Sequence, residues 1–371
     1  MIKIRKRILS IVLAVCFVLS LSSCDARCVQ FEELNIPTAE RFATGERARC
    51  ACDAVFYDGK LYIGSGDYGV NTAPTDIWCY DEKKEKWINS GSVRDETIGR
   101  FVEIDGKIVA PGTDPRDDWT FGNYYVLEED GWQTIRTIPG GIHNFDMVKF
   151  GGKLFVALGV LQGEMPVACS SDGGKTFERV PFYKDGKLID TTGEGNVRVY
   201  ELFTLKGKLY ALYREDKENV VYDLYRYDGT SFVFDNKWSG KLKSTGYGFN
   251  IVNGKFERDG RLFFATGYLY VTEDMNVMTQ IKFPEVHQIR DLYEYNNRLY
   301  ALGVSRINEQ LYRISVWRNK GASNDGFIEL LYFEYELPPT CFAYSGDNFY
   351  FCMGDNKVVH EKNGMVLKVE F

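Results

Sequence analysis

The chain has 371 residues, of which 15% are aromatic and 36 are glycine, and its formal net charge is −7 at pH 7. Such an acidic chain, with no basic stretch beyond its first residues, is unsuited to nucleic acid or to anionic lipid headgroups, so we exclude both as partners. The aromatic and glycine content favours an all-β, turn-rich fold and not a helical one.

Residues 1–23 have the order of a targeting segment. Four basic residues among the first seven precede the apolar run 8–20, which is too short to span a bilayer comfortably. The run ends in Leu21-Ser22-Ser23-Cys24, which resembles the lipobox of bacterial lipoproteins. This resemblance implies cleavage before Cys24, acylation of Cys24, and a place in the bacterial cell envelope, anchored by lipid at the outer side of the membrane. An ordinary secretory signal is the alternative.

Residues 24–49 are expected to be a tether followed by an entry strand near 31–36, and residues 50–371 to be one domain. The stretch 52–93 opens this domain with two apolar runs that flank Asp58-Gly59, the dipeptide that best favours a tight hairpin. A third run follows a glycine-rich loop, and Trp87 opens a fourth. Four short antiparallel strands of this kind make one blade of a β-propeller.

This unit recurs along the chain in two alternating series. The turn between the first and second strands is seen at Asp58-Gly59, Asp105-Gly106, Gly151-Gly152, Lys206-Gly207, Asp259-Gly260, Asn296-Asn297 and Gly346-Asp347. An apolar residue that opens the fourth strand is seen at Trp87, Trp132, Phe177, Phe232, Met278, Phe327 and Met365. Repeats of roughly 50 residues are typical of solenoids and propellers. Because no helical period is present, we predict a single seven-bladed β-propeller, with six or eight blades as alternatives.

The predicted blades are approximately 50–93, 94–140, 141–182, 183–238, 239–284, 285–333 and 334–371. The first resembles a kelch repeat in its Asp58-Gly59 hairpin, its glycines and Trp87. The third resembles the Asp-box of sialidases and related propellers, at Ser170, Asp172, Gly174, Thr176 and Phe177. The Asp-box resemblance implies a structural turn on the face away from any active site.

The loops between second and third strands, and the crossings between blades, are expected to share one face of the propeller. The longest are 66–76, 112–123, 183–197, 213–220 and 238–249, so we predict that this face, called here the loop face, binds the ligand. Tyr68, Trp119, Phe121 and Tyr247 lie in these loops. Exposed aromatic rings suit stacking on a sugar or anchoring a protein partner.

Seven equivalent positions, each eight residues before the apolar residue that opens a second strand, should face one axis. They are Asp53, Arg100, Asp146, Glu201, Gly254, Asp291 and Cys341. Carboxylates close together at this axis would raise one another's pKa or recruit a cation. Two alternatives are that they accept hydrogen bonds from buried backbone N–H groups, or that Arg100, Arg198 and Arg290 offset their charge. Of this group, Arg100, Asp146, Glu201, Arg290 and Asp291 are candidate ligand-binding residues.

The sequence is compatible with two classes of function. A surface-anchored, monomeric protein that binds a glycan or a partner protein is the preferred hypothesis. The alternative is a glycosidase or polysaccharide lyase, since His143, His287, Tyr200 and Arg198 are the residue types that β-propeller lyases use to abstract a proton. Because metal-ligand spacings are missing, no metal site is predicted, and no cofactor is predicted either. A cation bound in the central channel is the alternative.

One further expectation concerns a pair of cysteines. If Gly346-Asp347 is a two-residue turn, counting outward places Cys341 opposite Cys352 on adjacent strands. The pair is then either a strained cross-strand disulfide or two small buried thiols.

Overall fold

The structure, a computed structural model, describes residues 26–36, 50–66, 74–160, 163–192, 197–215, 221–238, 252–321, 324–354 and 360–371. Within these ranges the chain forms strands and turns and no helix, so it holds no helical segment able to cross a membrane. The targeting segment 1–23, Cys24, Tyr68 and Tyr247 lie outside the described residues.

The first part of the chain folds into antiparallel sheets of four strands, as the repeat predicts. The first sheet comprises β3 (Cys50–Tyr57), β4 (Lys60–Gly66), β5 (Thr75–Asp81) and β6 (Lys86–Val93). The second comprises β8 (Val102–Ile104), β9 (Lys107–Pro115), β10 (Phe121–Glu128) and β11 (Gly131–Pro139). The third comprises β12 (His143–Phe150), β13 (Lys153–Gly159), β14 (Val167–Ser170) and β15 (Glu178–Arg179).

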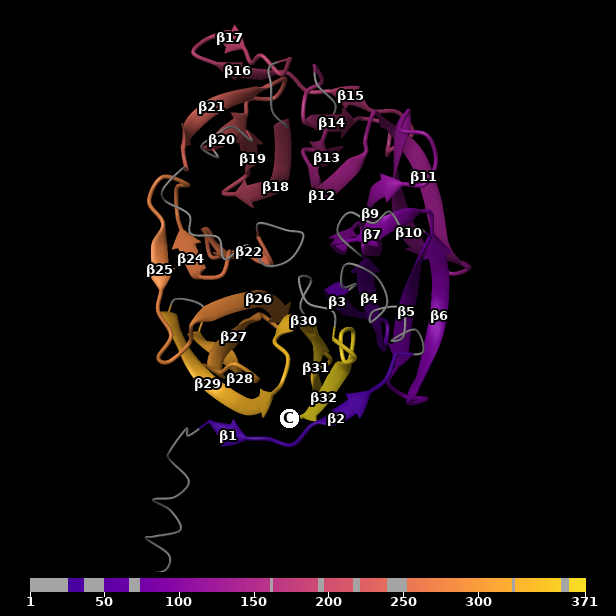
Figure 1. Ribbon diagram of the computed structural model, residues 1–371. Coiled ribbons are helices and arrows are strands. Elements are labelled where there is room, and N and C mark those ends of the chain that lie inside the picture. Colours follow the sequence, from indigo (N-terminus) through magenta and orange to yellow (C-terminus); the bar gives the residue numbers. More distant parts are fainter. Residues whose placement is uncertain are drawn as a thin grey trace, which may run out of the picture.

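Three more groups repeat this pairing and continue around a ring (Figure 1). They are β18 (Val197–Leu205), β19 (Lys208–Glu215), β20 (Val221–Tyr227) and β21 (Phe232–Lys237); β22 (Lys255–Arg258), β23 (Arg261–Ala265), β24 (Leu269–Thr272) and β25 (Thr279–Ile281); and β26 (Gln288–Tyr295), β27 (Arg298–Asn308), β28 (Leu311–Gly321) and β29 (Asn324–Tyr335). Successive groups bury aromatic rings between them, as where Phe203 lies 5.7 Å from Phe264. The core is therefore distributed around the ring.

The last sheet departs from the prediction that Met365 opens a fourth strand. Its strands β30 (Pro339–Tyr344), β31 (Asn348–Met353) and β32 (Val366–Glu370) follow in chain order, so Met365 precedes the third strand. The fourth strand is β2 (Glu32–Leu34), which pairs antiparallel with β32. The predicted entry strand thus covers an edge of β32 that would otherwise carry unpaired backbone groups. Figure 1 shows indigo β2 beside yellow β32.

Some predicted loops contain strands that the repeat pattern did not reveal. β7 (Asp95–Ile98) pairs with β4 and β9, and β1 (Arg27–Cys28) lies parallel to β29. The crossing expected at 183–197 starts with the hairpin of β16 (Phe182–Lys184) and β17 (Lys187–Leu188), and β16 pairs parallel with β21. The loop expected at 112–123 is shorter, because β9 continues to Pro115 and β10 begins at Phe121.

The turn at Ser170–Phe177 is held by its own side chains. The carboxylate of Asp172 accepts hydrogen bonds from the backbone N–H groups of Lys175 and Thr176 and from the Thr176 hydroxyl. Ser170 Oγ donates to Asp172 Oδ1 and accepts from the N–H of Gly174, whose φ of +90° is a glycine conformation. The Thr176 bonds, followed by that from Ser170, hold the pKa of Asp172 below its usual range.

Cys341 and Cys352 face each other across β30 and β31, so the predicted register is confirmed. The turn is closed by a 3.0 Å hydrogen bond from the Ser345 N–H to the Asn348 carbonyl. Both cysteines are buried free thiols that pack with the core.

The closing strand generates a prediction. Leu34 is buried among the residues between the first and last sheets. We expect Leu34→Ala to lower the free energy of unfolding by about 2–4 kcal/mol, because it leaves a cavity where β2 meets β32. Urea unfolding of the full chain in detergent measures this. Glu32→Ala, at an exposed position of the same strand, is the control, with an expected loss below about 1 kcal/mol; equal losses would contradict a stabilising role for β2.

Candidate functional site

The seven equivalent positions do gather at the centre of the ring. A β-bulge lies at five of them, where the register of the innermost strand shifts immediately before Asp53, Asp146, Glu201, Asp291 and Cys341. Bulges turn a side chain away from the regular pleat. The repeated bulges therefore turn these side chains toward the centre of the ring. We call the seven equivalent residues the axial ring (Asp53, Arg100, Asp146, Glu201, Gly254, Asp291 and Cys341).

Each aspartate of the axial ring joins its own strand to the next sheet. Its carboxylate accepts one hydrogen bond from the N–H of the following residue and one from the innermost segment of the next sheet. The donors are Ala54 and Phe101 for Asp53, Met147 and Leu202 for Asp146, and Leu292 and Phe342 for Asp291, at 2.6–3.1 Å. Part of the ring is thus structural, since these carboxylates satisfy buried backbone donors.

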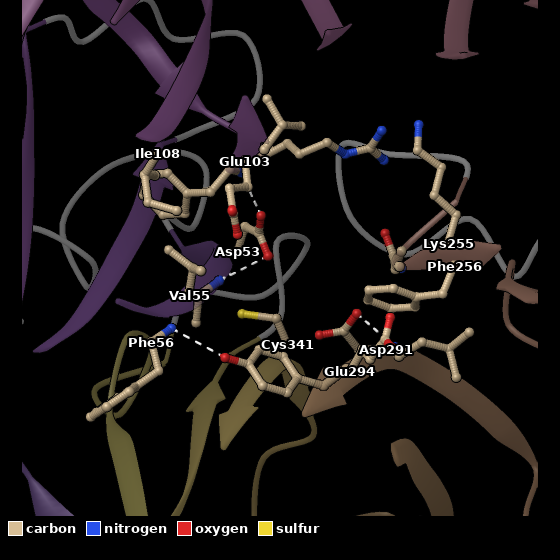
Figure 2. A pocket seen from close by; sticks show the side chains of 18 of the residues that line it. Asp53, Val55, Phe56, Glu103, Ile108, Lys255, Phe256, Asp291, Glu294 and Cys341 are labelled. Atoms are coloured by element: carbon tan, nitrogen blue, oxygen red, sulfur yellow. Dashed lines mark hydrogen bonds between the residues drawn. The ribbon is translucent and has the colours of Figure 1, made fainter. Parts of the chain in front are cut away.

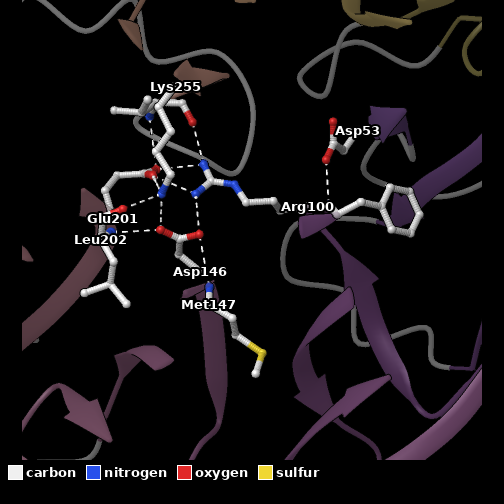
Figure 3. Close-up of polar contacts among 9 residues, drawn as sticks. Asp53, Arg100, Asp146, Met147, Glu201, Leu202 and Lys255 are labelled. Atoms are coloured by element: carbon white, nitrogen blue, oxygen red, sulfur yellow. Dashed lines mark hydrogen bonds and ion pairs between the residues drawn. The ribbon is translucent and has the colours of Figure 1, made fainter. Parts of the chain in front are cut away.

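Arg100 neutralises the side of the ring formed by the third and fourth sheets. Its Nη1 lies 2.6 Å from Glu201 Oε2 and 3.2 Å from Asp146 Oδ1, while Nη2 donates to Glu201 Oε1 at 2.8 Å. Nη2 also donates to the carbonyl of Val252. This bidentate arrangement is the strong form of the arginine–carboxylate pair. Figure 3 shows the guanidinium between the two carboxylates.

Lys255 completes this cluster and was not found from the sequence. Its ammonium bonds to Asp146, lies 3.2 Å from Glu201 Oε2 and donates to the Leu202 carbonyl at 2.8 Å. A signal was present in the repeat. The residue after the ring position is apolar in the other units (Ala54, Phe101, Met147, Leu202, Leu292 and Phe342), and only the unit with Gly254 has lysine there.

The two sides of the axial ring differ in electrostatics. Burial alone would raise the pKa of Asp146, but Lys255 and Arg100 reverse this and hold it below the usual value. Burial opposes the charge on Arg100, yet Glu201 and Asp146 raise its pKa. On the other side, burial raises the pKa of Asp53 to about 6, and burial followed by the neighbouring Asp53 raises that of Asp291 well above the usual value.

A cavity of about 460 Å³ adjoins the Asp53–Asp291 side of the ring. It follows the innermost strands to Tyr57 and Tyr295, which directly precede hairpin turns. It therefore lies on the hairpin-turn side of the ring, opposite the loop face on which the sequence placed the site. Figure 2 shows Asp53 and Glu103 on one wall and Asp291 and Glu294 on the other.

On the loop face, the structure presents aromatic side chains. Trp119 is 51% exposed and Phe121 is 39% exposed. The preceding turn is braced by Arg136, which bonds to Asp118 at 2.9 Å, and by Arg94, which bonds to Asp117. The described residues thus hold two exposed rings on an ion-paired turn.

Of the four catalytic candidates, Arg198 and Tyr200 are in direct contact, His143 is connected to Tyr200 only through the ring of Phe145, and His287 lies elsewhere. His143 stacks on Phe145, which stacks on Tyr200 at 4.4 Å, and Arg198 donates to the Tyr200 hydroxyl at 3.1 Å. His287 precedes β26, where its Nδ1 accepts from the Arg306 N–H.

Of the three arginines expected to offset the ring carboxylates, Arg100 does so, and the other two take other places. Arg198 lies over the Phe145 ring, and Arg290 is buried next to Asp291 in β26. In the part of the chain that the structure describes, Lys255 joins Arg100 in forming the ion pairs of the ring. No group of three or more His, Cys, Asp or Glu side chains there is arranged to hold a metal ion.

Comparisons with known proteins bear on the fold alone. No family model matches the sequence, and no curated protein matches it. Puromycin hydrolase is similar in structure, with a TM-score of 0.50 and 11% identity over 89% of this chain, which spans about half (53%) of that protein. A putative 6-phosphogluconolactonase from Bacteroides fragilis gives a TM-score of 0.47 at 12% identity, covering 79% of this chain and 88% of that one. Sqt1 of Saccharomyces cerevisiae gives 0.44 at 8%, covering 88% and 97%. These structural neighbours are β-propellers, and the fold of this chain is all-β and of that kind.

The Arg100 cluster generates a stability prediction. Arg100→Leu leaves Asp146 and Glu201 buried with only Lys255 to balance them, so we expect the free energy of unfolding to fall by about 3–5 kcal/mol. Lys107→Met removes the exposed pair with Glu128 and should cost less than about 1 kcal/mol. Urea unfolding of both variants of the full chain in detergent measures the difference, and similar losses would show that the cluster does not stabilise the ring.

Proposed function

We propose that the protein is a lipid-anchored, seven-bladed β-propeller that binds a glycan through its loop face. The observation that carries the proposal is the exposure of Trp119 and Phe121 beside an ion-paired turn. A monomeric propeller at the outer side of a bacterial membrane would present this face to the medium.

The strand pairings support seven blades. Six groups of four strands follow one another in the chain, and β30, β31, β32 and β2 supply the seventh. The closing β2 strand joins the two ends of the repeat series, and closure removes exposed sheet edges. A crystal structure of the full chain would test the blade count directly.

The ion pairs around Trp119 suit carbohydrate recognition. Arg136 contacts Asp117 and Asp118, and the Asp118 side chain is 72% exposed. A flat indole offers an apolar face to the C–H side of a sugar ring, while neighbouring charged groups can bond to its hydroxyls. Because salt bridges brace the turn, less conformational freedom would be lost on binding.

The axial ring supports binding over hydrolysis. A glycosidase needs two carboxyl groups open to the substrate across a glycosidic bond. Here Asp53, Asp146 and Asp291 accept backbone hydrogen bonds, and Asp146 is also ion-paired. These contacts support a structural role for the ring carboxylates over a role as catalytic acid and base.

A polysaccharide lyase is the second candidate, favoured by the contact of Arg198 with Tyr200 and by His143, which stacks on Phe145 next to Tyr200. His143 Nε2 lies 3.1 Å from Asp114 Oδ2, a contact that would orient the imidazole. Release of unsaturated products from acidic polysaccharides, lost in His143→Gln, would favour this candidate over a binding protein.

Trp119 provides the residue-level test. We expect Trp119→Ala to weaken glycan binding by about 1–3 kcal/mol, as for a central aromatic anchor, without lowering the melting temperature. A glycan array followed by titration calorimetry on the full chain in detergent measures the change. Leu188→Ala, which removes an exposed apolar side chain on β17, should bind as the unaltered protein does. Unchanged affinity in Trp119→Ala would refute the proposed site, and capture of a protein but no glycan would change the ligand class.

The membrane anchor is tested separately. We expect mass spectrometry of the membrane fraction to find Cys24 as the N-terminal residue, carrying acyl chains that make the chain partition into detergent. Cys24→Ser should abolish acylation and release the protein from the membrane fraction. A soluble product with an unmodified terminus at another residue would refute the anchor.

A further inference from the structure

The cavity beside the axial ring has the dimensions of a ligand site. Its volume of about 460 Å³ is enclosed by innermost strands of the first, second, fifth and sixth sheets and by Cys341 of the last. Pockets of about 300–1,000 Å³ hold small organic molecules in other proteins. The structural role of the ring does not require this open volume, since the opposite side is filled by the Arg100 cluster.

The wall of this cavity is rich in acidic side chains. Asp53, Glu103, Asp291 and Glu294 line it. Arg100 and Lys255 also reach the wall, but their charged ends bind Asp146 and Glu201, which do not line it. Those two cations pair directly with two other carboxylates, so the four lining carboxylates have no ion pair with them, although Arg100 still lowers the pKa of Asp53 and Asp291 from a distance.

Two of these carboxylates, the buried Asp291 and the half-buried Asp53, have no ion pair among the described residues. Asp53 and Asp291 form no salt bridge with any described residue, and Asp291 is 6% exposed. Each accepts two backbone N–H bonds, whereas a carboxylate has about four acceptor positions. Buried charge is costly unless it is paired. A cation brought by a ligand would provide the missing partner.

Aromatic rings line the same cavity. Phe256, Tyr293 and Tyr295 contribute to its wall, together with Phe56 and Tyr57. The Tyr293 hydroxyl accepts a hydrogen bond from the Phe56 N–H at 3.3 Å, which fixes the orientation of that ring. Ring faces attract organic cations, and their contact also covers the hydrocarbon part of such a ligand.

The spacing of the carboxylates favours an organic cation over a metal ion. In the described ranges, no three acidic or other metal-ligating side chains converge on a single point. Figure 2 shows Asp53 and Glu103 on one wall and Asp291 and Glu294 facing them from another. Two separated acidic groups on either side of an aromatic-lined space match a molecule with more than one ammonium group.

We propose that this cavity binds a small aliphatic di- or triamine, with its ammonium groups at the Asp53–Glu103 and Asp291–Glu294 walls. The site lies on the hairpin-turn side of the ring and is independent of the Trp119 site on the loop face. Amine binding would therefore be a second activity of the same propeller.

The test is titration calorimetry of the full chain in detergent with spermidine at low ionic strength. We expect saturable binding of one spermidine per chain. The double substitution Glu103→Gln with Glu294→Gln should weaken it at least about tenfold, since each change removes one charge interaction. Both side chains lie at the cavity wall. Among the described residues, neither forms a hydrogen bond or ion pair with the axial ring, so the variant should fold normally.

The matched control is the double substitution Glu334→Gln with Glu370→Gln. Both residues are exposed outside the cavity, and the control changes the net charge by the same amount. It should alter the spermidine affinity less than about twofold. No saturable binding, equal weakening in the two double variants, or equal competition by Mg²⁺ would each overturn the proposal. None of these outcomes depends on whether Trp119 binds a glycan.

Discussion

The buried cluster of Arg100, Lys255, Asp146 and Glu201 is the constraint around which the ring is built. Ions removed from water are stabilising only when their geometry is good and their remaining hydrogen-bonding positions are filled. Here two cations meet two carboxylates, and the remaining positions are filled by the backbone groups of Val252 and Leu202. The cluster joins the second, third, fourth and fifth sheets, so a shift of one sheet would leave a buried charge without its partner.

The aspartates of the axial ring also join neighbouring sheets. Each binds an N–H group of the next sheet, so neighbouring sheets are connected by charge-assisted hydrogen bonds as well as by apolar packing. The ring is nevertheless asymmetric. On one side, Arg100 and Lys255 fill the centre, while on the other, Asp53, Asp291 and Cys341 border an open cavity. The same repeated position therefore serves structure on one side and leaves a chemically distinct space on the other.

The two faces of the molecule also differ in what they offer a ligand. The loop face presents Trp119 and Phe121 on a turn braced by arginine–aspartate pairs, which suits a flat, hydroxylated ligand. The hairpin-turn side leads to a narrower space with acidic and aromatic walls, which suits a small cation. The axial ring separates these two environments.

The sequence by itself determined the repeat, the strand order within the first six units, the equivalent inward positions and the pairing of Cys341 with Cys352. These follow from local rules, because turn dipeptides and alternating apolar residues fix where a strand begins and which side faces the core. Only the tertiary structure decided that β2 completes the last sheet, that Lys255 joins the ring, and that a cavity lies beside Asp53 and Asp291. Those features depend on which strands and side chains meet between distant parts of the chain, up to 336 positions apart for Glu32 and Lys368. The repeat shows that lysine replaces an apolar residue at position 255, but it does not show which carboxylates the ammonium meets.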